Sequence, residues 1–267
     1  MTTLVSWVGV DQRGQASFYI ASDSRITWGE NESWNIGKKV FASLGSPDIF
    51  AYCGDVLLPS MVLSQVVDLA DGQALYPDNS NPEDRAKHLE SFLTSAIGEY
   101  PKKRINPFTI LYATRFGSGV GCAFHLYRFD WSFGSELIRN KVEIPIVSDV
   151  ALCLGTGKDF VFESHLSWKN AQGSTSRGVF SAFCDALLSK GYPRSGGAPQ
   201  LVGIYREGTG RKFGVIFCDT TFFGGVQIKN IEFLQSLEWR NEKFERCDSV
   251  SRTCLSGAQK HPRPRNF

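Results

Sequence analysis

The chain has 267 residues, of which 42% are hydrophobic and 21% are charged, and its formal net charge is +2. This balance is typical of a folded globular protein and excludes a disordered chain. Lys and Arg are not clustered on any one predicted element, so the charge does not indicate nucleic-acid binding. No stretch approaches the roughly 18 consecutive apolar residues that a membrane-spanning helix needs.

The N-terminal segment and the cysteines indicate the compartment. The opening MTTLVSWVGVD has no basic region followed by an uninterrupted apolar stretch, so it is not a secretory signal. The seven cysteines are an odd number, and most of them lie in apolar stretches where a reduced thiol packs as a small hydrophobe. Without a CxxC pair and with only four histidines, a zinc site is not indicated. We therefore expect a cytoplasmic protein that uses no metal or other cofactor.

Strands are predicted first along the chain. Alternating apolar stretches at residues 3–10 and 16–22 flank the turn-forming segment 11–14, which predicts an N-terminal hairpin. Residues 40–42 and 49–53 make a second, shorter pair of strands.

The apolar spacing then changes to that of helices, at residues 63–70 and 89–97 on either side of a polar loop. Four strand-like stretches, a second pair of helices and two more strands follow in that order. They cover residues 108–114, 122–129, 135–142 and 150–154, then 160–168 and 179–188, then 200–206 and 212–218.

The order of these elements predicts the fold class. Blocks of strands separated by helix pairs favour antiparallel sheets with helices on their outer faces over an alternating doubly wound sheet. We therefore expect an α+β protein with a four-layer αββα sandwich, formed by residues 2–226 as one domain. Residues 227–267 are polar and end in KHPRPRNF, which predicts a short helix followed by a flexible basic tail.

The second residue has a chemistry of its own. Met1 is removed from chains whose next side chain is small, and its removal here would expose Thr2 with both a hydroxyl and a free α-amine. An α-amine with an ordinary pKa of about 7.7–8.0 can take the hydroxyl proton, so one residue supplies nucleophile and general base. Many chains begin Met-Thr, and this position alone also fits an ordinary processed terminus.

Four segments of the chain resemble the opening of proteasome β-subunits and their bacterial two-component relatives, which are N-terminal nucleophile hydrolases. They are TTLVS at 2–6, ASDSRIT at 21–27 followed by Gly29, GKKV at 37–40 and AYCGD at 51–55.

The resemblance implies that Thr2 is the nucleophile and that Asp23 and Lys39 lie beside it. A cationic lysine lowers the pKa of a nearby hydroxyl, and a neighbouring carboxylate holds that lysine in place. Lys39 is chosen over Lys38 because the second lysine of the family pattern points inward. Taken singly, Asp23 and Lys39 fit a structural ion pair, whereas in this register with Thr2 they favour catalysis.

The resemblance assigns an oxyanion residue and a substrate pocket. Gly54 matches the glycine whose backbone N–H faces the developing negative charge on the substrate carbonyl. Thr27 matches the position whose backbone pairs with an extended substrate. Ile26, Tyr52 and Val56 match the walls and floor of the primary specificity pocket, which implies an apolar pocket shortened by the Tyr52 ring.

Two later segments complete the resemblance. The Gly-Thr-Gly at 155–157 resembles a family Gly-Ser-Gly, with Thr156 keeping the hydroxyl that bonds the terminal amine. The stretch 192–197 resembles the segment that carries a supporting Asp and Ser, and Ser195 matches the Ser. Tyr192 stands where the family has the Asp, and this departure leaves an inactive protein as an alternative.

The resemblance implies a threonine peptidase of the bacterial branch, with no propeptide before Thr2, that cleaves peptides or unfolded proteins inside a homo-oligomeric ring. Whether an ATP-dependent unfoldase is a partner is left open. Two alternatives remain, a small-molecule amidohydrolase with the same nucleophile and a non-catalytic ring or scaffold subunit. The three site residues together favour an enzyme, and the oligomeric state separates the peptidase from the amidase.

Overall fold

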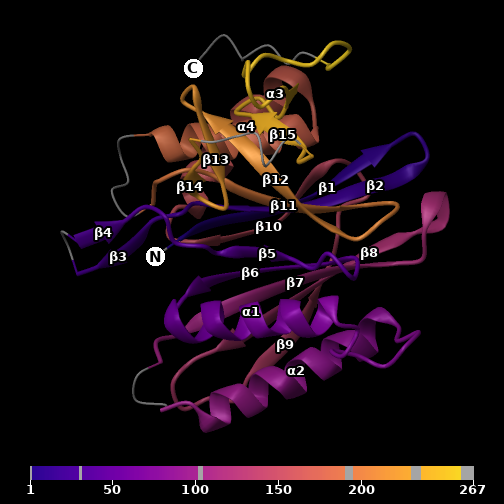
Figure 1. The fold of residues 1–267 in the computed structure, drawn as a ribbon, viewed down its shortest axis with the longest axis vertical. Coiled ribbons are helices and arrows are strands. Elements are labelled where there is room, and N and C mark those ends of the chain that lie inside the picture. The colour runs from indigo at the N-terminus through magenta and orange to yellow at the C-terminus, as the bar shows by residue number, and fades with distance from the viewer. Residues whose placement is uncertain (1, 30–31, 102–104, 190–194, 230–235, 260–267) are drawn as a thin grey trace.

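Two β-sheets pack face to face, and each carries a pair of helices on its outer side, which confirms the predicted αββα sandwich (Figure 1). The coordinates are a computed structural model of the chain. They describe all residues except 1, 30–31, 102–104, 190–194, 230–235 and 260–267.

The first sheet has nine strands, and the second strand along its path is the N-terminal one. Its path runs β10 (Asp149–Gly155), β1 (Thr3–Asp11), β2 (Gly14–Ser22), β11 (Gln200–Tyr205), β12 (Gly210–Phe217), β13 (Thr220–Phe223) and β14 (Val226–Gln227). Off this path, β15 (Trp239–Asn241) pairs with β12 and with β16 (Arg246–Cys247).

The second sheet has five antiparallel strands and faces the first. Its order is β5 (Val40–Ala42), β6 (Asp48–Gly54), β7 (Phe108–Phe116), β8 (Ala123–Trp131) and β9 (Ile138–Val142). A separate ribbon, β3 (Ile26–Trp28) with β4 (Glu32–Trp34), joins β2 to β5, and η2 (Gly119–Gly121) is a short 3-10 turn between β7 and β8.

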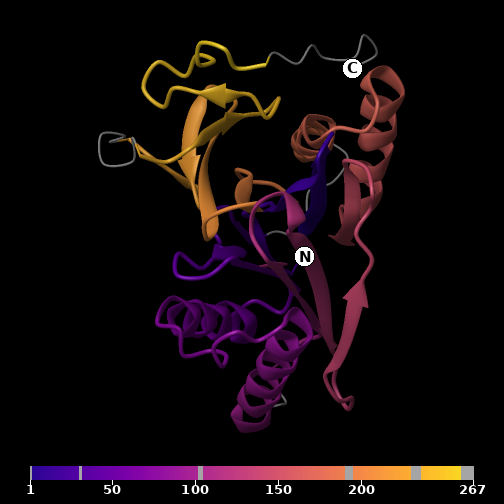
Figure 2. The same ribbon diagram turned by 90° about the vertical axis from the view of Figure 1, so that its right-hand side faces the viewer.

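Each helix pair covers one sheet. Helices α1 (Leu57–Asp71) and α2 (Pro82–Glu99) lie on the second sheet, and α3 (Lys158–Gln172) and α4 (Ser176–Leu188) lie on the first. Figure 2 shows the two pairs at opposite ends of the molecule. The start of α2 follows from its sequence, because the Asn81 side chain accepts the N–H of Asp84 and Pro82 stands in the first turn. Among the described helices, none combines the length and the apolar composition needed to cross a bilayer.

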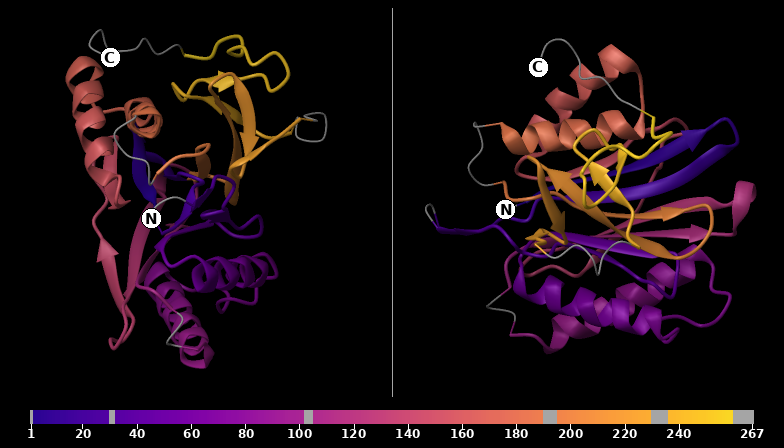
Figure 3. Two further views of the ribbon diagram at one scale, coloured as in Figure 1. Left: turned by 90° about the vertical axis from the view of Figure 1, so that its left-hand side faces the viewer. Right: turned by 45° about the horizontal axis from the view of Figure 1, so that its top comes forward.

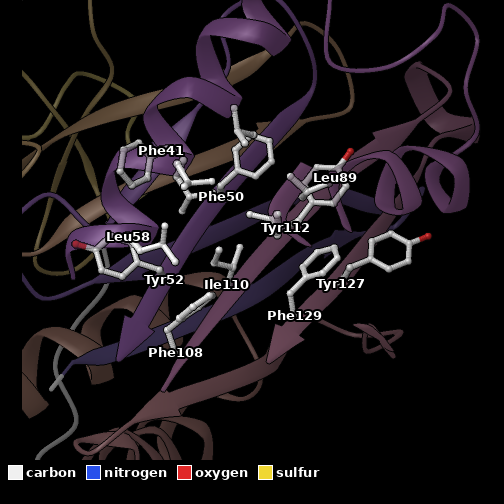
Figure 4. Packing of buried hydrophobic residues seen from close by; sticks show 14 of the residues in the cluster. Phe41, Phe50, Tyr52, Leu58, Leu89, Phe108, Ile110, Tyr112, Tyr127 and Phe129 are labelled. Carbon is white, nitrogen blue, oxygen red and sulfur yellow. The ribbon is translucent and has the colours of Figure 1, made fainter. Parts of the chain in front are cut away.

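Strand alternation divides the core into layers. In β6 and β7, Tyr52 and Tyr112 face α1 and α2, where they join a cluster of aromatic and aliphatic side chains (Figure 4). The intervening residues Ala51 and Leu111 face the first sheet and pack in the cluster between the sheets. Successive side chains of a strand point to opposite faces, so one strand supplies both layers. A third cluster joins the first sheet to α3 and α4.

The C-terminal region adds to the first sheet. Strand β15 pairs in parallel with β12, and the yellow segment that follows β15 lies near β12 in Figure 3. Between 236 and 259 the structure has strands and turns but no helix. Residues 230–235 and 260–267, where the rest of the predicted helix and tail falls, lie outside the described residues.

Candidate active site

Thr2 directly precedes β1, which is paired on both sides, with β10 and with β2. Its carbonyl oxygen accepts the N–H of Thr156 at 3.0 Å, and the carbonyl of Thr3 accepts the N–H of Asp23 at 3.1 Å. Gly155 has a φ of +86°, and a Cβ there would lie 1.8 Å from the Thr2 carbonyl oxygen. The position therefore needs glycine for both its conformation and its space. Only 2% of the surface of Thr2 is exposed.

Asp23 and Lys39 form an ion pair between the sheets, behind the start of β1. Lys39 Nζ lies 2.8 Å from Asp23 Oδ1 and also donates to the carbonyl of Arg25 at 2.5 Å. The Asp23 carboxylate further accepts the N–H groups of Thr3 at 3.0 Å, Gly196 at 3.2 Å and Arg25 at 3.3 Å. The side chain of Lys39 is 1% exposed and that of Asp23 is 0% exposed. The pair is thus attached to β1 through the N–H of the residue that follows Thr2.

Burial sets the protonation behaviour of this region. Desolvation lowers the pKa of Lys39 from its ordinary value, and the neighbouring Asp23 carboxylate opposes that effect. The nearby Cys53 thiol has its pKa raised by burial to about 11, so it stays protonated at neutral pH. Lys39 therefore gives up its proton more readily than an exposed lysine does.

The Ser195 hydroxyl lies 2.5 Å from the hydroxyl of Thr3. The resemblance matched Ser195 to a supporting serine of the family, and this role stays a prediction. Gly157 makes room for the observed contact, because a Cβ there would lie 2.0 Å from Thr3 Oγ1 and 3.1 Å from Ser195 Oγ. Tyr192, at the place of the supporting Asp, lies outside the described residues.

A cleft with a volume of about 1040 Å³ opens beside Thr2. Five of the residues assigned from the sequence line it together with Thr2: Ile26, Thr27, Gly54, Val56 and Thr156. Further apolar lining comes from Trp28, Phe108, Trp131 and Ile138. A cleft of this size fits several substrate side chains.

Tyr52 does not line this cleft. Its ring packs 6.4 Å from that of Phe41, and its hydroxyl donates to the carbonyl of Lys38 at 3.0 Å (Figure 4). Because side chains alternate along β6, the next residue, Cys53, faces the cleft instead. Tyr52 therefore belongs to the layer under α1, and the cleft is not shortened by its ring.

A polar row across the second sheet was not expected from the sequence. Cys53 pairs with Thr109 and Thr109 pairs with Asp130, so the three lie side by side on β6, β7 and β8. Thr109 Oγ1 donates to Asp130 Oδ1 at 2.6 Å, and Arg128 Nε donates to the same oxygen at 2.9 Å. All four residues line the cleft. These residues come together only through the strand register, and no local sequence pattern predicts this polar row.

The described part of the chain contains no cluster of three or more His, Cys, Asp or Glu side chains able to hold a metal ion.

The four-layer fold is similar to that of solved structures, although the sequence identities are low. No family model matches the chain, and no curated protein matches it. A mutant of Anbu from Hyphomicrobium sp. strain MC1 is 13% identical, with a TM-score of 0.51 over 79% of this chain and 86% of that one.

Two further solved structures are similar at lower scores. One is BPH from Thiobacillus denitrificans in complex with epoxomicin, 15% identical, with a TM-score of 0.49 over 78% of this chain and all of that one. The other is HslV from Trypanosoma brucei, 9% identical, with a TM-score of 0.47 over 76% of this chain and 99% of that one.

Proposed function

We propose that the chain is a proteasome-like threonine peptidase of the bacterial branch, working in the cytoplasm, with Thr2 as its nucleophile once Met1 is removed. The observation that carries the proposal is the buried Lys39–Asp23 pair, which contacts the N–H of Thr3 directly after Thr2. Thr2 itself lines the cleft of about 1040 Å³. The ion pair next to β1 and the cleft that Thr2 lines both support a nucleophile at this position.

In the proposed reaction the free α-amine of Thr2 takes the proton from the Thr2 hydroxyl. The oxygen attacks the substrate carbonyl, and the negative charge that develops there meets the backbone N–H of Gly54. The amine returns the proton to the departing nitrogen, which leaves an ester on Thr2. Water activated by the same amine then releases the acid. Lys39 in its cationic form favours the step in which the hydroxyl oxygen gains negative charge.

A purely structural role explains the buried ion pair poorly. Moving two charges out of water costs several kcal/mol, and apolar residues of similar volume commonly stabilise a core as well or better. Asp23 accepts three backbone N–H groups, so its carboxylate is already satisfied without the lysine. The cation is therefore better explained by chemistry at the start of β1.

The substrate proposed is a peptide or unfolded protein. Thr27 lines the cleft from the short ribbon of β3 and β4, where an extended chain can pair with the backbone. The cleft walls that Ile26, Val56 and Phe108 provide suit apolar side chains.

The assembly proposed is a homo-oligomeric ring that encloses the active sites. Apolar side chains remain exposed on the outer helical layers: Leu57 and Met61 on α1 are 58% and 56% exposed, and Leu166 on α3 is 57% exposed. Such side chains are expected at contacts between subunits. The proposal needs no unfoldase for cleavage of short peptides.

Intact mass after treatment with a peptide electrophile directed at N-terminal threonine tests the nucleophile. We expect a chain without Met1 that gains one adduct, and no adduct on the Thr2→Ala variant. A preparation that retains Met1 and still hydrolyses peptides would refute the mechanism.

Light scattering at several protein concentrations tests the assembly. A large particle supports the peptidase. A monomer or dimer that cleaves small amides supports the amidohydrolase, and a protein of any size that does not react with the electrophile supports a scaffold.

A further inference from the structure

One buried amide contacts the backbone on both sides of the Lys39–Asp23 pair. Gln200 is the first residue of β11, and 1% of its surface is exposed. Its Oε1 accepts the N–H of Lys39 at 3.1 Å. Its Nε2 donates to the carbonyl oxygens of Asp23 at 3.2 Å and Gly37 at 2.7 Å.

These contacts fix the orientation of the Gln200 amide. The two carbonyl oxygens need a donor and the Lys39 N–H needs an acceptor. If the amide were flipped, its oxygen would face the two carbonyl oxygens and its NH2 group would face the Lys39 N–H. Both N–H bonds of the amide and its oxygen are used. The side chain therefore has one arrangement, and that arrangement fixes three backbone groups.

The three backbone groups lie next to strands of two different sheets. Asp23 directly follows β2 of the first sheet, and Gly37 to Lys39 lead into β5 of the second. The Gln200 amide is thus a bridge between the two segments whose side chains form the ion pair. If the bridge is lost, the segments are free to shift relative to each other.

We propose that Gln200 is a positioning residue of the active site. It keeps the Lys39 ammonium next to the Asp23 carboxylate and, in this way, in a fixed position relative to Thr2. This proposal rests on the proposed function. Misplacing a catalytic group by about 1 Å can cost on the order of 10² in rate. The expected effect is therefore on the chemical step rather than on substrate binding.

Gln15 offers a matched control within the same sheet. Its Oε1 accepts the N–H of Phe124 at 3.1 Å, so it too is a glutamine that joins β2 to the second sheet. It lies seven residues before Ser22 at the other end of β2, which is roughly 23 Å away for an extended strand. Replacing it removes one part-buried hydrogen bond between the sheets without touching the site.

The experiment compares wild type, Thr2→Ala, Gln200→Met and Gln15→Met for melting temperature, peptide hydrolysis and electrophile labelling. We expect Gln200→Met to lower kcat by about 10- to 100-fold with little change in KM. Gln15→Met should lower the melting temperature but leave kcat per folded molecule unchanged.

A folded Gln200→Met with a wild-type kcat would overturn the positioning role. Should Gln200→Met not fold, Gln200→Asn, which keeps the amide but shortens the side chain by one methylene, is tested in the same way. If neither folds while Gln15→Met does, the amide supports the domain and the proposal is wrong. An inactive wild type that labels no better than Thr2→Ala instead rejects the proposed function, and with it this role.

A second, independent observation concerns Cys247 and Cys254, which face each other in an isolated antiparallel bridge. The flanking hydrogen bonds run from the N–H of Asp248 to the carbonyl of Thr253 and from the N–H of Leu255 to the carbonyl of Arg246, both 2.9 Å. The cysteines are therefore a non-hydrogen-bonded pair, in which Cα atoms lie about 4.5 Å apart. Disulfides span Cα distances of about 4.4–6.8 Å.

We infer that Cys247 and Cys254, both thiols in this structure, form a disulfide site that responds to peroxide. Hydrogen peroxide oxidises the more exposed Cys254 to a sulfenic acid and releases one water. The sulfur of Cys247 then displaces the hydroxyl of that sulfenic acid, so that a second water leaves and the S–S bond forms. The bond would join β16 to the segment that follows it.

Peptide mapping and intact mass after treatment with hydrogen peroxide test the disulfide. We expect a loss of about 2 Da, a crosslink between Cys247 and Cys254 and a higher melting temperature, all reversed by dithiothreitol. Cys218→Ser, which removes an exposed cysteine of a nearby turn, should behave as wild type, and Cys254→Ser should not crosslink. Peroxide that yields sulfinic acids or links Cys218 while Cys247 and Cys254 stay apart overturns the inference.

Discussion

Two charged clusters join distant parts of this chain, and their surroundings differ. Lys39 and Asp23 link the two sheets with 1% and 0% of their side chains exposed. Arg139 of β9 links to Glu83 and Glu90 of α2 at 2.5 and 2.8 Å, with 18%, 44% and 31% exposed. The first cluster contacts the N–H of Thr3, and the second lies on the outer face of the second sheet.

The exposure of these two clusters decides how strongly their charges interact with each other and with water. In the buried pair, desolvation lowers the pKa of Lys39 even with a carboxylate beside it. In the outer cluster, hydrogen bonding to Arg139 lowers the pKa of Glu83, so both partners stay ionised at neutral pH. Water and salt screen such a cluster, and its contribution to stability is small. We therefore expect the buried pair to affect mainly the rate of hydrolysis. The outer cluster should make a small contribution to the free energy of unfolding.

The largest effect expected is that of Thr2→Ala, which removes the nucleophile. Hydrolysis should fall on the order of 10⁴-fold or more, and labelling by the electrophile should disappear. The fold should be kept, because the Thr2 contact with Thr156 is made by the backbone. Steady-state kinetics and intact mass measure the loss. Turnover by the variant at the wild-type rate would remove Thr2 from the mechanism.

Lys39→Ala tests the buried pair directly. The rate should drop by about 10²- to 10⁴-fold, because the cation beside the hydroxyl is lost. Folding should survive, since Asp23 keeps its three backbone N–H donors. Lys38→Ala is the control, since the Lys38 ammonium lies over the Phe41 ring at 4.4 Å and should barely affect the rate. If a stopped peptide assay gives the same rate of hydrolysis for Lys39→Ala and Lys38→Ala, Lys39 has no special role in the reaction.

The pH dependence should show the depressed pKa of Lys39. Between the folded-state pKa and the ordinary value of 10.5, the unfolded chain binds more protons at this residue than the folded chain does. The free energy of unfolding contributed by Lys39 therefore rises with pH across that window, while the cation that assists Thr2 is lost. We expect kcat to fall on an alkaline limb that begins below pH 10.5. For Lys39→Met, we expect rate profiles without this alkaline fall in kcat. Urea unfolding of the same variant should show no rise of the free energy of unfolding with pH in this window.

The smallest effect expected is that of Arg139→Ala. Losing two partly exposed ion pairs should lower the free energy of unfolding by about 1 kcal/mol, and less at high salt. The rate of peptide hydrolysis per folded molecule should not change. Urea unfolding at two salt concentrations, beside an activity assay, measures both quantities. A large loss of activity here would show that the outer cluster is coupled to the cleft.

Most of the fold was predictable from the sequence because its signals are local. The alternation in residues 3–10 and 16–22 and the helical spacing in 89–97 arise from the geometry of single elements. The short strands β3, β4 and β13 to β16 were not predicted, since runs of two to four residues carry too little periodicity.

The candidate site was only partly predictable. Thr2, Asp23 and Lys39 stand at motif positions, and their catalytic roles remain predictions that the variants above test. The roles of Tyr52 and Ser195 were carried over from the resemblance. Tyr52 lies in the layer under α1 and outside the cleft, and the Ser195 hydroxyl contacts that of Thr3.

The sequence by itself determined the longer strands and the four helices through residue 218 and the αββα class, because side-chain spacing within one element follows from the backbone of that element. Only the tertiary structure decided the contacts between residues far apart in the chain. Gln200 reaches Lys39 across 161 positions, and β15 joins β12 in parallel. Such contacts depend on strand register and sheet packing, which no local pattern specifies.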